Sequence, residues 1–202
     1  MALLRSPIAC LFAVLIAVSA GGVSIRAQAQ DTRPPVRNES TTRQELLDKL
    51  FARLKAVRSG DEAKALEVAI QKVWMSSGSA SVDLLMSHGE EAMAAKNYGE
   101  ALYYFDEVVS LAPGYAEGWN KRSAVHYLME NYSAALSDLE HVLRLEPRHF
   151  KAMAGLAIIL EDLGDKKGAL DAYRRALQLD PWLAGVPERI KKLEPEVEGR
   201  GI

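Results

Sequence analysis

The sequence predicts an all-α protein: an α-solenoid of antiparallel helix pairs, with three repeated units between an N-terminal helical hairpin and a C-terminal capping helix. The first observation is a proline period, since 147 − 113 and 181 − 147 both give 34 for Pro113, Pro147 and Pro181. The second is that apolar residues before each proline recur at helical spacing. The third is composition, because 202 residues that are 49% hydrophobic and 26% charged can bury one core.

The N-terminal residues indicate an export signal. Arg5 precedes a dense apolar run at 8–18, and Ala27-Gln28-Ala29 matches a signal-peptidase site, with a cut after Ala20 as an alternative. Cleavage would give a periplasmic protein, and we expect no membrane insertion of the mature chain. The alternative is an inner-membrane anchor, since residues 6–25 carry no charge. We favour cleavage because the apolar run has the length of a signal-peptide core.

Cysteine content and net charge exclude several function classes. Cys10 is the only cysteine and lies in the expected signal peptide, so the mature chain has no thiol for disulfides, thiolate catalysis or metal ligation. Removal of Arg5 and Arg26 leaves 25 − 2 = 23 basic residues against 27 acidic ones, a net charge of −4. Without a basic stripe, nucleic acid is not an expected partner.

Residues 42–80 are expected to form an antiparallel helical hairpin. They follow a tether at 30–41, where a double proline and the lack of an apolar period predict flexibility. Thr42 and Glu45 form a capping-box pattern that predicts the start of the first helix. Apolar stripes at helical spacing flank the turn "SGD". The segment "GDEAKAL" resembles the later "GDKKGAL", and the sequence leaves open whether the hairpin is a degenerate repeat.

Five further positions recur every 34 residues in three copies, and we call each set of corresponding residues a column. The residues of these columns form one apolar stripe on the second helix of each copy, with alanine where two helix backbones approach closely. The proline ends each second helix, because it lacks a donor and disfavours helix in the residue before it. The columns are Ala101, Ala135 and Ala169; Leu102, Leu136 and Leu170; Phe105, Leu139 and Tyr173; Val108, Val142 and Ala176; and Leu111, Leu145 and Leu179.

A 34-residue unit of two helices closed by a proline resembles the tetratricopeptide repeat. The resemblance covers about Ser81 to Pro181, and Trp119 stands where the family has its first-helix tryptophan. The segment "NYSAALSDLEHVLRLEP" follows the family's second-helix pattern closely. The first helices depart from the pattern: Leu85 and Met153 replace tryptophan, and His88 and Arg122 occupy a column where the family prefers leucine.

A short last helix is expected to cover the end of the stack. Pro187 can open it, and Ile190 and Leu193 can pack on the third repeat, as a solenoid end requires. The expected divisions are a signal peptide at 1–29, a tether at 30–41, a hairpin at 42–80, three repeats at about 81–113, 114–147 and 148–181, and a capping helix with tail at 182–202.

The stretch "RLEPRHF" groups Glu146, Arg148 and His149 around one proline. The corresponding junctions read "LAPGY" and "LDPWL", so the charged group is not repeated. We therefore predict a solvated turn between repeats, with Phe150 anchoring the next helix, and not a catalytic or metal site.

No catalytic, cofactor or metal motif is found in the mature sequence. It lacks a nucleophile elbow, a phosphate-binding glycine loop, a paired-histidine zinc motif and a dinucleotide fingerprint. No two histidines are spaced by four residues, and His88 and His126 are expected to pack or line a groove. We therefore predict no catalytic residues, no cofactor, no metal and no enzyme activity.

The resemblance implies a concave surface lined by the first helix of each pair, which such proteins use to bind partners. Methionine and tyrosine on such a surface suit adaptable contacts with another protein or a peptide segment. Internal packing is an equal alternative for Met93 and Ala124. The groove-facing positions that the resemblance implies are Asp83, Met86, Glu90, Met93, Glu117, Asn120, Lys121, Ala124, Tyr127, Lys151, Ala154, Ile158 and Glu161.

The resemblance also argues against one subclass. Family members that clamp a terminal carboxylate use lysine and asparagine in adjacent first helices, whereas Met86, Glu90 and Gly155 fill such places here and Lys151 alone is kept. The whole pattern is similar to small exported tetratricopeptide proteins of Gram-negative bacteria, which implies a periplasmic adaptor in cell-envelope assembly or maintenance. The alternatives are a self-associating structural solenoid and, less favoured, an enzyme centred on His126 or His149. The oligomeric state stays open.

Overall fold

The computed structural model describes residues 39–199, with side chains from Thr42 onward. The expected signal peptide and nearly all of the expected tether lie outside these residues. Across the described range the chain forms helices and no strand. The helices are α1 (Glu39–Ala56), α2 (Gly60–Met75), α3 (Ala80–Ala94), α4 (Tyr98–Leu111), α5 (Ala116–Leu128), α6 (Tyr132–Leu145), α7 (Phe150–Asp162), α8 (Lys166–Leu179) and α9 (Val186–Val197).

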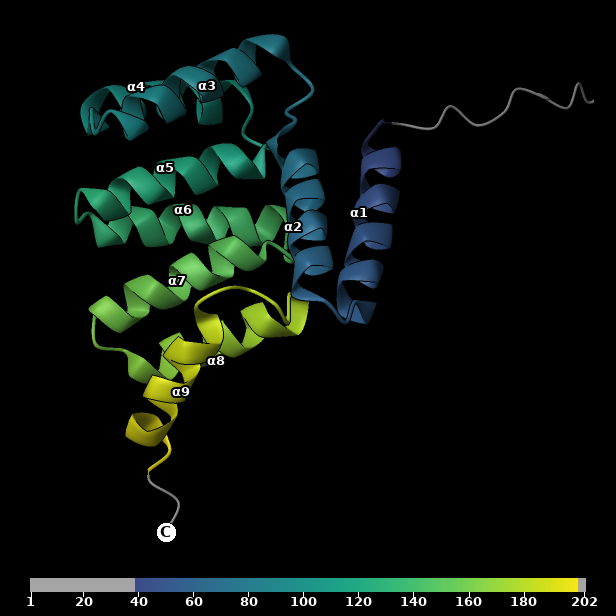
Figure 1. Cartoon of the computed structure of the whole chain (residues 1–202). Helices are drawn as coiled ribbons and strands as arrows, with labels where there is room; N and C mark the ends of the chain where they lie inside the picture. Colours follow the sequence, from purple (N-terminus) through teal and green to yellow (C-terminus); the bar gives the residue numbers. More distant parts are fainter. Residues whose placement is uncertain (1–38, 200–202) are drawn as a thin grey trace, which may run out of the picture. The chain divides into compact units, whose positions relative to one another are not determined.

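Helices α3 to α8 form three antiparallel pairs that stack in chain order (Figure 1). Helix α4 packs on α5, and α6 packs on α7, so each pair rests on the next one. Helix α9 packs on α8, and its Leu193 is buried in the same core cluster as Tyr173 of α8. This arrangement confirms the predicted α-solenoid of three helix pairs with a C-terminal capping helix.

Local capping explains where several helices begin and end. The side chains of Asn131, His149 and Asp165 each accept a backbone N–H in the first turn of α6, α7 and α8, which satisfies an otherwise unpaired donor. The second helix of each pair ends two residues before its proline, as the missing donor of proline requires.

The turn inside each pair contains one residue in the left-handed region. Lys96, Glu130 and Gly164 have φ values of 60°, 59° and 83°, and they occupy one column because 130 − 96 and 164 − 130 are both 34. Only the third turn uses glycine, which adopts this conformation without strain, whereas a residue with a Cβ loses about 1 kcal/mol there. The repeat geometry thus imposes this turn on sequences that do not favour it.

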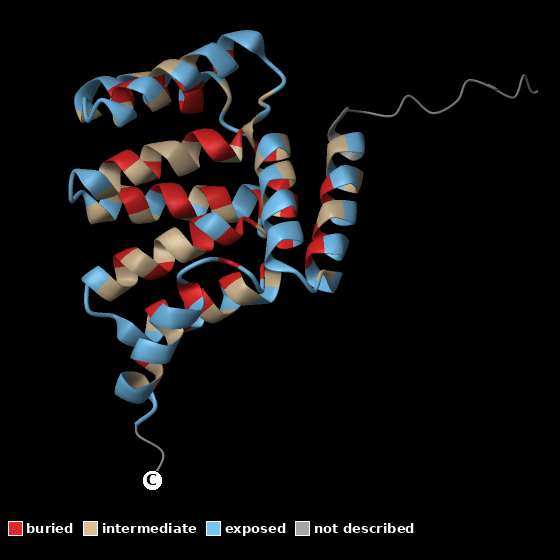
Figure 2. Ribbon diagram, in the orientation of Figure 1, coloured by how far each residue is buried: buried red, intermediate tan, exposed pale blue. Residues whose placement is uncertain are grey.

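The α1–α2 hairpin lies across the ends of α5 to α8 and does not continue the stack before α3 (Figure 1). The Trp74 ring centroid on α2 is 5.2 Å from that of Phe150 on α7, and Phe51 on α1 is 6.2 Å from Phe150. The Tyr115 hydroxyl donates to the Met75 carbonyl oxygen at 2.8 Å. The hairpin therefore covers the junctions between repeats, where Figure 2 shows buried residues.

Helix α1 begins earlier than the sequence predicts. It starts at Glu39, so Thr42 lies inside the first turn of the helix and does not cap it. The prediction of an N-cap at Thr42 is therefore wrong.

The "RLEPRHF" junction is not a solvated turn, and this prediction is also wrong. His149 is 0% exposed and Glu146 is 9% exposed. The Arg148 guanidinium donates to Asp48 of α1 at 2.6 Å and lies over the Phe51 ring, 4.8 Å from its centroid. The physical reason is the hairpin, which closes over this junction and removes its side chains from water.

Candidate functional site

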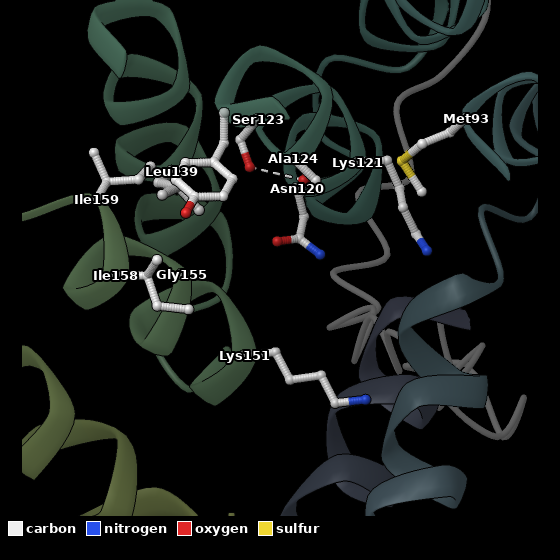
Figure 3. Close-up of a pocket in the computed structure, with 11 residues that line it drawn as sticks. Met93, Asn120, Lys121, Ser123, Ala124, Leu139, Lys151, Gly155, Ile158 and Ile159 are labelled. Carbon is white, nitrogen blue, oxygen red and sulfur yellow. Dashed lines mark hydrogen bonds between the residues drawn. The ribbon is translucent and has the colours of Figure 1, made fainter. Parts of the chain in front are cut away.

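The first helices of the three pairs border a cavity of about 270 Å³ (Figure 3). We call it the groove. Its floor is mainly apolar, and polar side chains lie around it. The groove is lined by Met93 of α3; by Asn120, Lys121, Ser123, Ala124 and Tyr127 of α5; by Leu139 of α6; and by Lys151, Gly155, Ile158 and Ile159 of α7.

Gly155 keeps the floor of the groove open. A Cβ at this position would meet only Leu139, 4.0 Å away, so the free space comes from the absence of a side chain and not from a tight helix crossing. Any larger side chain at Gly155 would project into space that a bound partner could use.

A second cavity of about 370 Å³ shares Lys151, Gly155 and Ile158 with the groove. It extends past α7 to Tyr173 of α8 and Arg189 of α9. The two cavities therefore adjoin along α7, and we call them together the extended groove.

Tyr127 stands at the end of the groove where α5 faces α7. Its hydroxyl donates to Asp162 Oδ2 at 2.9 Å, and this hydrogen bond raises the pKa of the Tyr127 phenol. The Tyr127 and Tyr132 rings have centroids 6.0 Å apart. The aromatic face of Tyr127 is thus held in place while the side chain stays partly exposed.

Two lysines have different partners in the groove. Lys121 Nζ lies 2.5 Å from Glu90 Oε1, which balances its charge and links α5 to α3. Lys151 Nζ donates instead to Gln71 Oε1 at 2.9 Å, and Figure 3 shows its side chain reaching toward the α1–α2 hairpin. Unlike Lys121, Lys151 has a neutral hydrogen-bond partner, and the carboxylates of Glu67 and Asp180 lie within the range of its charge.

The sequence-predicted groove residues line the groove, make local contacts beside it, or are buried away from it. Met93, Asn120, Lys121, Tyr127, Lys151 and Ile158 line the groove, as do Ala124 and, in the second cavity, Ala154. Three other charged residues serve local contacts: Asp83 accepts from the Ser77 N–H and hydroxyl, Glu90 pairs with Lys121, and Glu161 pairs with Arg189 at 2.7 Å.

Met86 and Glu117 do not face the groove, so these two predictions are wrong. Met86 is 2% exposed and packs in a cluster with Tyr115, against which Met75 at the end of α2 also packs. Glu117 is 1% exposed and accepts hydrogen bonds from Gln71 at 3.0 Å and from His149 at 2.9 Å. In both cases α2 covers a part of a first helix that the repeat pattern alone predicts to be exposed.

Sequence reasoning missed other groove residues. Ser123 and Ile159 lie on the first helices next to predicted positions, and the helical spacing of the lining residues could have identified them. Gln71 and Arg189 come from α2 and α9, outside the three repeats. No sequence signal places those two residues near the groove.

The described histidines do not form a catalytic arrangement. His149 is fully buried, so no substrate can reach its ring in this fold. His126 Nε2 lies 4.0 Å from Asp138 Oδ2, beyond hydrogen-bonding distance, and its Nδ1 is buried without a hydrogen-bond partner. Within residues 39–199, no three His, Asp or Glu side chains are placed to hold a metal ion.

The arrangement defines a helical-repeat scaffold with an extended groove. Residues 125–181 match the tetratricopeptide repeat family model. A TPR repeat-containing protein of Rhizobium etli is 39% identical over 163 residues, which are 81% of this chain and 80% of that protein. The chain therefore belongs to the tetratricopeptide repeat family. None of the helices in the described part is both long and apolar enough to span a membrane.

Other similar proteins match a smaller share of this chain or do so at lower identity. The Hsp70-Hsp90 organizing protein of Triticum aestivum is 33% identical over 104 residues, which are 52% of this chain but 18% of that protein. The first tetratricopeptide domain of Spaghetti (RPAP3), solved with an HSP90 peptide, has a TM-score of 0.56 at 18% identity and covers 58% of this chain and 93% of that one. MamA has a TM-score of 0.56 at 18% identity, with coverage of 71% and 87%. The two structural likenesses show the fold.

Proposed function

We propose that this protein is a non-catalytic adaptor that binds a peptide or helical segment of another protein in the extended groove. The observation that carries the proposal is the pair of adjoining cavities along α7, whose apolar floor is left open by Gly155. Apolar side chains of a partner can fill this floor, while Asn120, Tyr127 and Lys151 offer polar contacts at its edge.

The comparisons support a peptide ligand in a general sense. The Spaghetti (RPAP3) domain is described as bound to an HSP90 peptide, and the TPR2B domain of yeast Sti1 as a pHsp70 complex. Peptide binding by this chain is a proposal drawn from that likeness. We do not extend it to a terminal-carboxylate clamp, because Glu90 is paired with Lys121 and Gly155 offers no side chain.

A pull-down with purified protein tests the adaptor role. Replacement of both Asn120 and Tyr127 by alanine should remove the partner that the wild type retains, because both side chains line the groove. The control is the Glu140→Ala/Arg144→Ala variant, which truncates two exposed side chains on α6 outside the groove and should retain the partner. Loss of the partner in the control but not in the groove variant would contradict the proposal.

We also propose that the adaptor works in the periplasm, in cell-envelope assembly or maintenance, after cleavage of the N-terminal signal. The proposal rests on the apolar run at 8–18 and the small residues that follow it. Mass spectrometry of the N-terminus of protein recovered from a periplasmic fraction tests it. A mature N-terminus at Gln30 is expected, and an intact N-terminus in the inner-membrane fraction would support the anchored alternative.

A further inference from the structure

We propose that the open end of the repeat stack, formed by the outer sides of α3 and α4, is a second docking surface that binds a basic amphipathic helix of a partner protein. We call it the end face. It lies away from the extended groove, so this inference stands independently of the proposed function.

The repeat spacing shows that the end face lacks a covering helix. In the second pair, Gly118 and Val125 of α5 face α4: Val125 is 0% exposed, and a Cβ on Gly118 would lie 2.6 Å from a Val108 methyl group. The residues 34 positions earlier are Leu84 and Glu91 of α3. Leu84 is 57% exposed and Glu91 is also exposed, because none of the helices within residues 39–199 packs on this side of α3.

The N-terminal hairpin does not fill the place of the missing helix. Its core residues join the cluster built on α7 and α8, and its polar contacts reach the junctions between repeats. Figure 2 shows the outer surface of the α3–α4 pair as largely exposed. The described part of the chain thus has an end cap at α9 and no corresponding cap at α3.

Aromatic rings and carboxylates gather on the end face. A shallow cavity of about 400 Å³ there is lined by His88, Glu91, Ala92, Ala95, Glu100 and Tyr104. The Tyr104 ring lies edge-on to His88 at 5.3 Å and to Tyr103 at 5.4 Å, and Tyr103 is 61% exposed. Leu84 and Tyr103 are therefore two large exposed side chains of the α3–α4 pair that a partner could cover.

The charges of the end face favour a cationic partner. Residues 80–112 contain six acidic residues and one basic residue, Lys96. The hydrogen-bonding partners of the two cavity carboxylates are neutral: the Ser87 hydroxyl donates to Glu91 at 3.4 Å, and the Asn97 amide donates to Glu100 at 2.7 Å. Lysine or arginine side chains can pair with both carboxylates and lie over the exposed tyrosine rings.

A helix is the form of partner that the site favours. In the stack, α4 packs on α5 and α6 packs on α7, so the first helix of the second and third pairs is covered by the preceding helix. The end face presents the same side of α3, the first helix of the first pair. Leu84, His88, Glu91 and Ala95 follow one another at helical spacing along that side. A partner helix with an apolar stripe over Leu84 and Tyr103 and cations toward Glu91 and Glu100 would be complementary to them.

Fluorescence anisotropy with a labelled synthetic helix tests the proposal. The probe has a leucine stripe flanked by lysines, and two comparison probes carry glutamate in place of lysine or the same residues in an order without a stripe. Wild-type protein should bind the first probe and not the other two. The Glu91→Lys/Glu100→Lys variant should weaken binding of the lysine probe about tenfold or more, as the reversal of two charge contacts implies.

Two control variants make the outcome specific. Glu140→Lys/Asp171→Lys makes the same change in net charge at exposed positions on α6 and α8, and it should leave binding unchanged. Gly155→Leu blocks the extended groove, and it should also leave binding of this probe unchanged. Equal losses in all three variants, or a loss only in Gly155→Leu, would overturn the end-face assignment without affecting the groove proposal. Light scattering that shows a dimer lost in the Glu91→Lys/Glu100→Lys variant would overturn it in favour of a second copy of this chain.

Discussion

His149 Nε2 lies 2.9 Å from Glu117 Oε2, and neither side chain reaches solvent. His149 Nδ1 accepts the Ala152 backbone N–H, so the ring proton lies on Nε2 and is donated to the carboxylate. Burial alone would raise the pKa of Glu117, but the hydrogen bond from His149 holds it below its usual range. The Trp74 ring stacks on the imidazole at 4.1 Å, so this pair joins α2, α5 and α7.

We predict that His149→Ala lowers the free energy of unfolding by about 3 kcal/mol, because Oε2 of the buried Glu117 carboxylate loses its His149 donor and only Oε1 keeps its amide donors. Urea denaturation measures the change. Adding Glu117→Gln to this variant should recover part of the loss, since a neutral amide is less costly to bury than a charge. The control, His141→Ala, should change little because His141 is partly exposed on α6. Equal stability of the single and double variants would show that the buried charge is not the cause.

A second prediction concerns the ion pair between Arg122 and Asp138. Arg122 Nη2 lies 2.6 Å from Asp138 Oδ1, and Asp138 is 2% exposed. Arg122→Leu should destabilise the fold by about 3 kcal/mol, because Asp138 stays buried and charged without its partner.

The third repeat suggests a double variant that should restore the stability lost in Arg122→Leu. It has Leu156 and Ala172 at the positions that correspond to Arg122 and Asp138, since 156 − 122 and 172 − 138 are both 34. Arg122→Leu/Asp138→Ala should therefore return the free energy of unfolding to within about 1 kcal/mol of the wild type. Thermal and urea unfolding would contradict this if the double variant were as unstable as Arg122→Leu.

A third prediction concerns the pH dependence of stability through Glu67 and Asp180. Burial raises the pKa of Asp180, and burial followed by the Asp180 charge raises the pKa of Glu67. Asp180 is 0% exposed, and its Oδ2 accepts no hydrogen bond from an amide, hydroxyl or cationic donor in the described part of the chain, whereas the Glu67 carboxyl lies within hydrogen-bonding range of Asp180. For acids whose pKa is raised by folding, the stabilising contribution is present below their unfolded pKa values of about 4 and is lost as pH rises through the folded values.

Glu67→Gln should therefore be more stable than the wild type at pH 8, with the difference shrinking toward pH 4. The substitution removes one charge beside Asp180 and provides an amide donor that needs no proton uptake to pair with the Asp180 carboxylate. Urea denaturation at a series of pH values measures the difference, with the exposed Glu140→Gln as control. A constant difference between Glu67→Gln and wild type across this range would rule out the proposed coupling.

The repeats could be predicted from the sequence because their determinants are local and periodic. The alanine column and the closing prolines fix the helix crossings and ends within each 34-residue unit, and the structure has three such units. Groove residues such as Tyr127 and Lys151 could be predicted for the same reason, since the helical period places them on one side of the first helices.

The burial of Glu117, Met86 and His149 could not be predicted in this way. Each depends on where α2 packs, and that placement is set by tertiary contacts such as Trp74 on His149 and Gln71 on Glu117. These contacts join residues far apart in sequence and outside the period. Without them, a charged "EPRH" junction has the composition of an exposed turn.

Photocrosslinking from position 127 tests the central claim, that the extended groove binds a segment of another protein. A photoreactive amino acid in place of Tyr127 is introduced in intact cells, in the Gly155→Leu background and in a Gly99→Leu background as control, because Gly99 has open space around it outside the groove. We expect a discrete crosslinked partner when the photoreactive residue is the only change and when it is combined with Gly99→Leu. We expect the crosslinked partner to be lost when it is combined with Gly155→Leu. A crosslinked partner that persists equally in Gly155→Leu, or no crosslinked protein in any background, would contradict the claim.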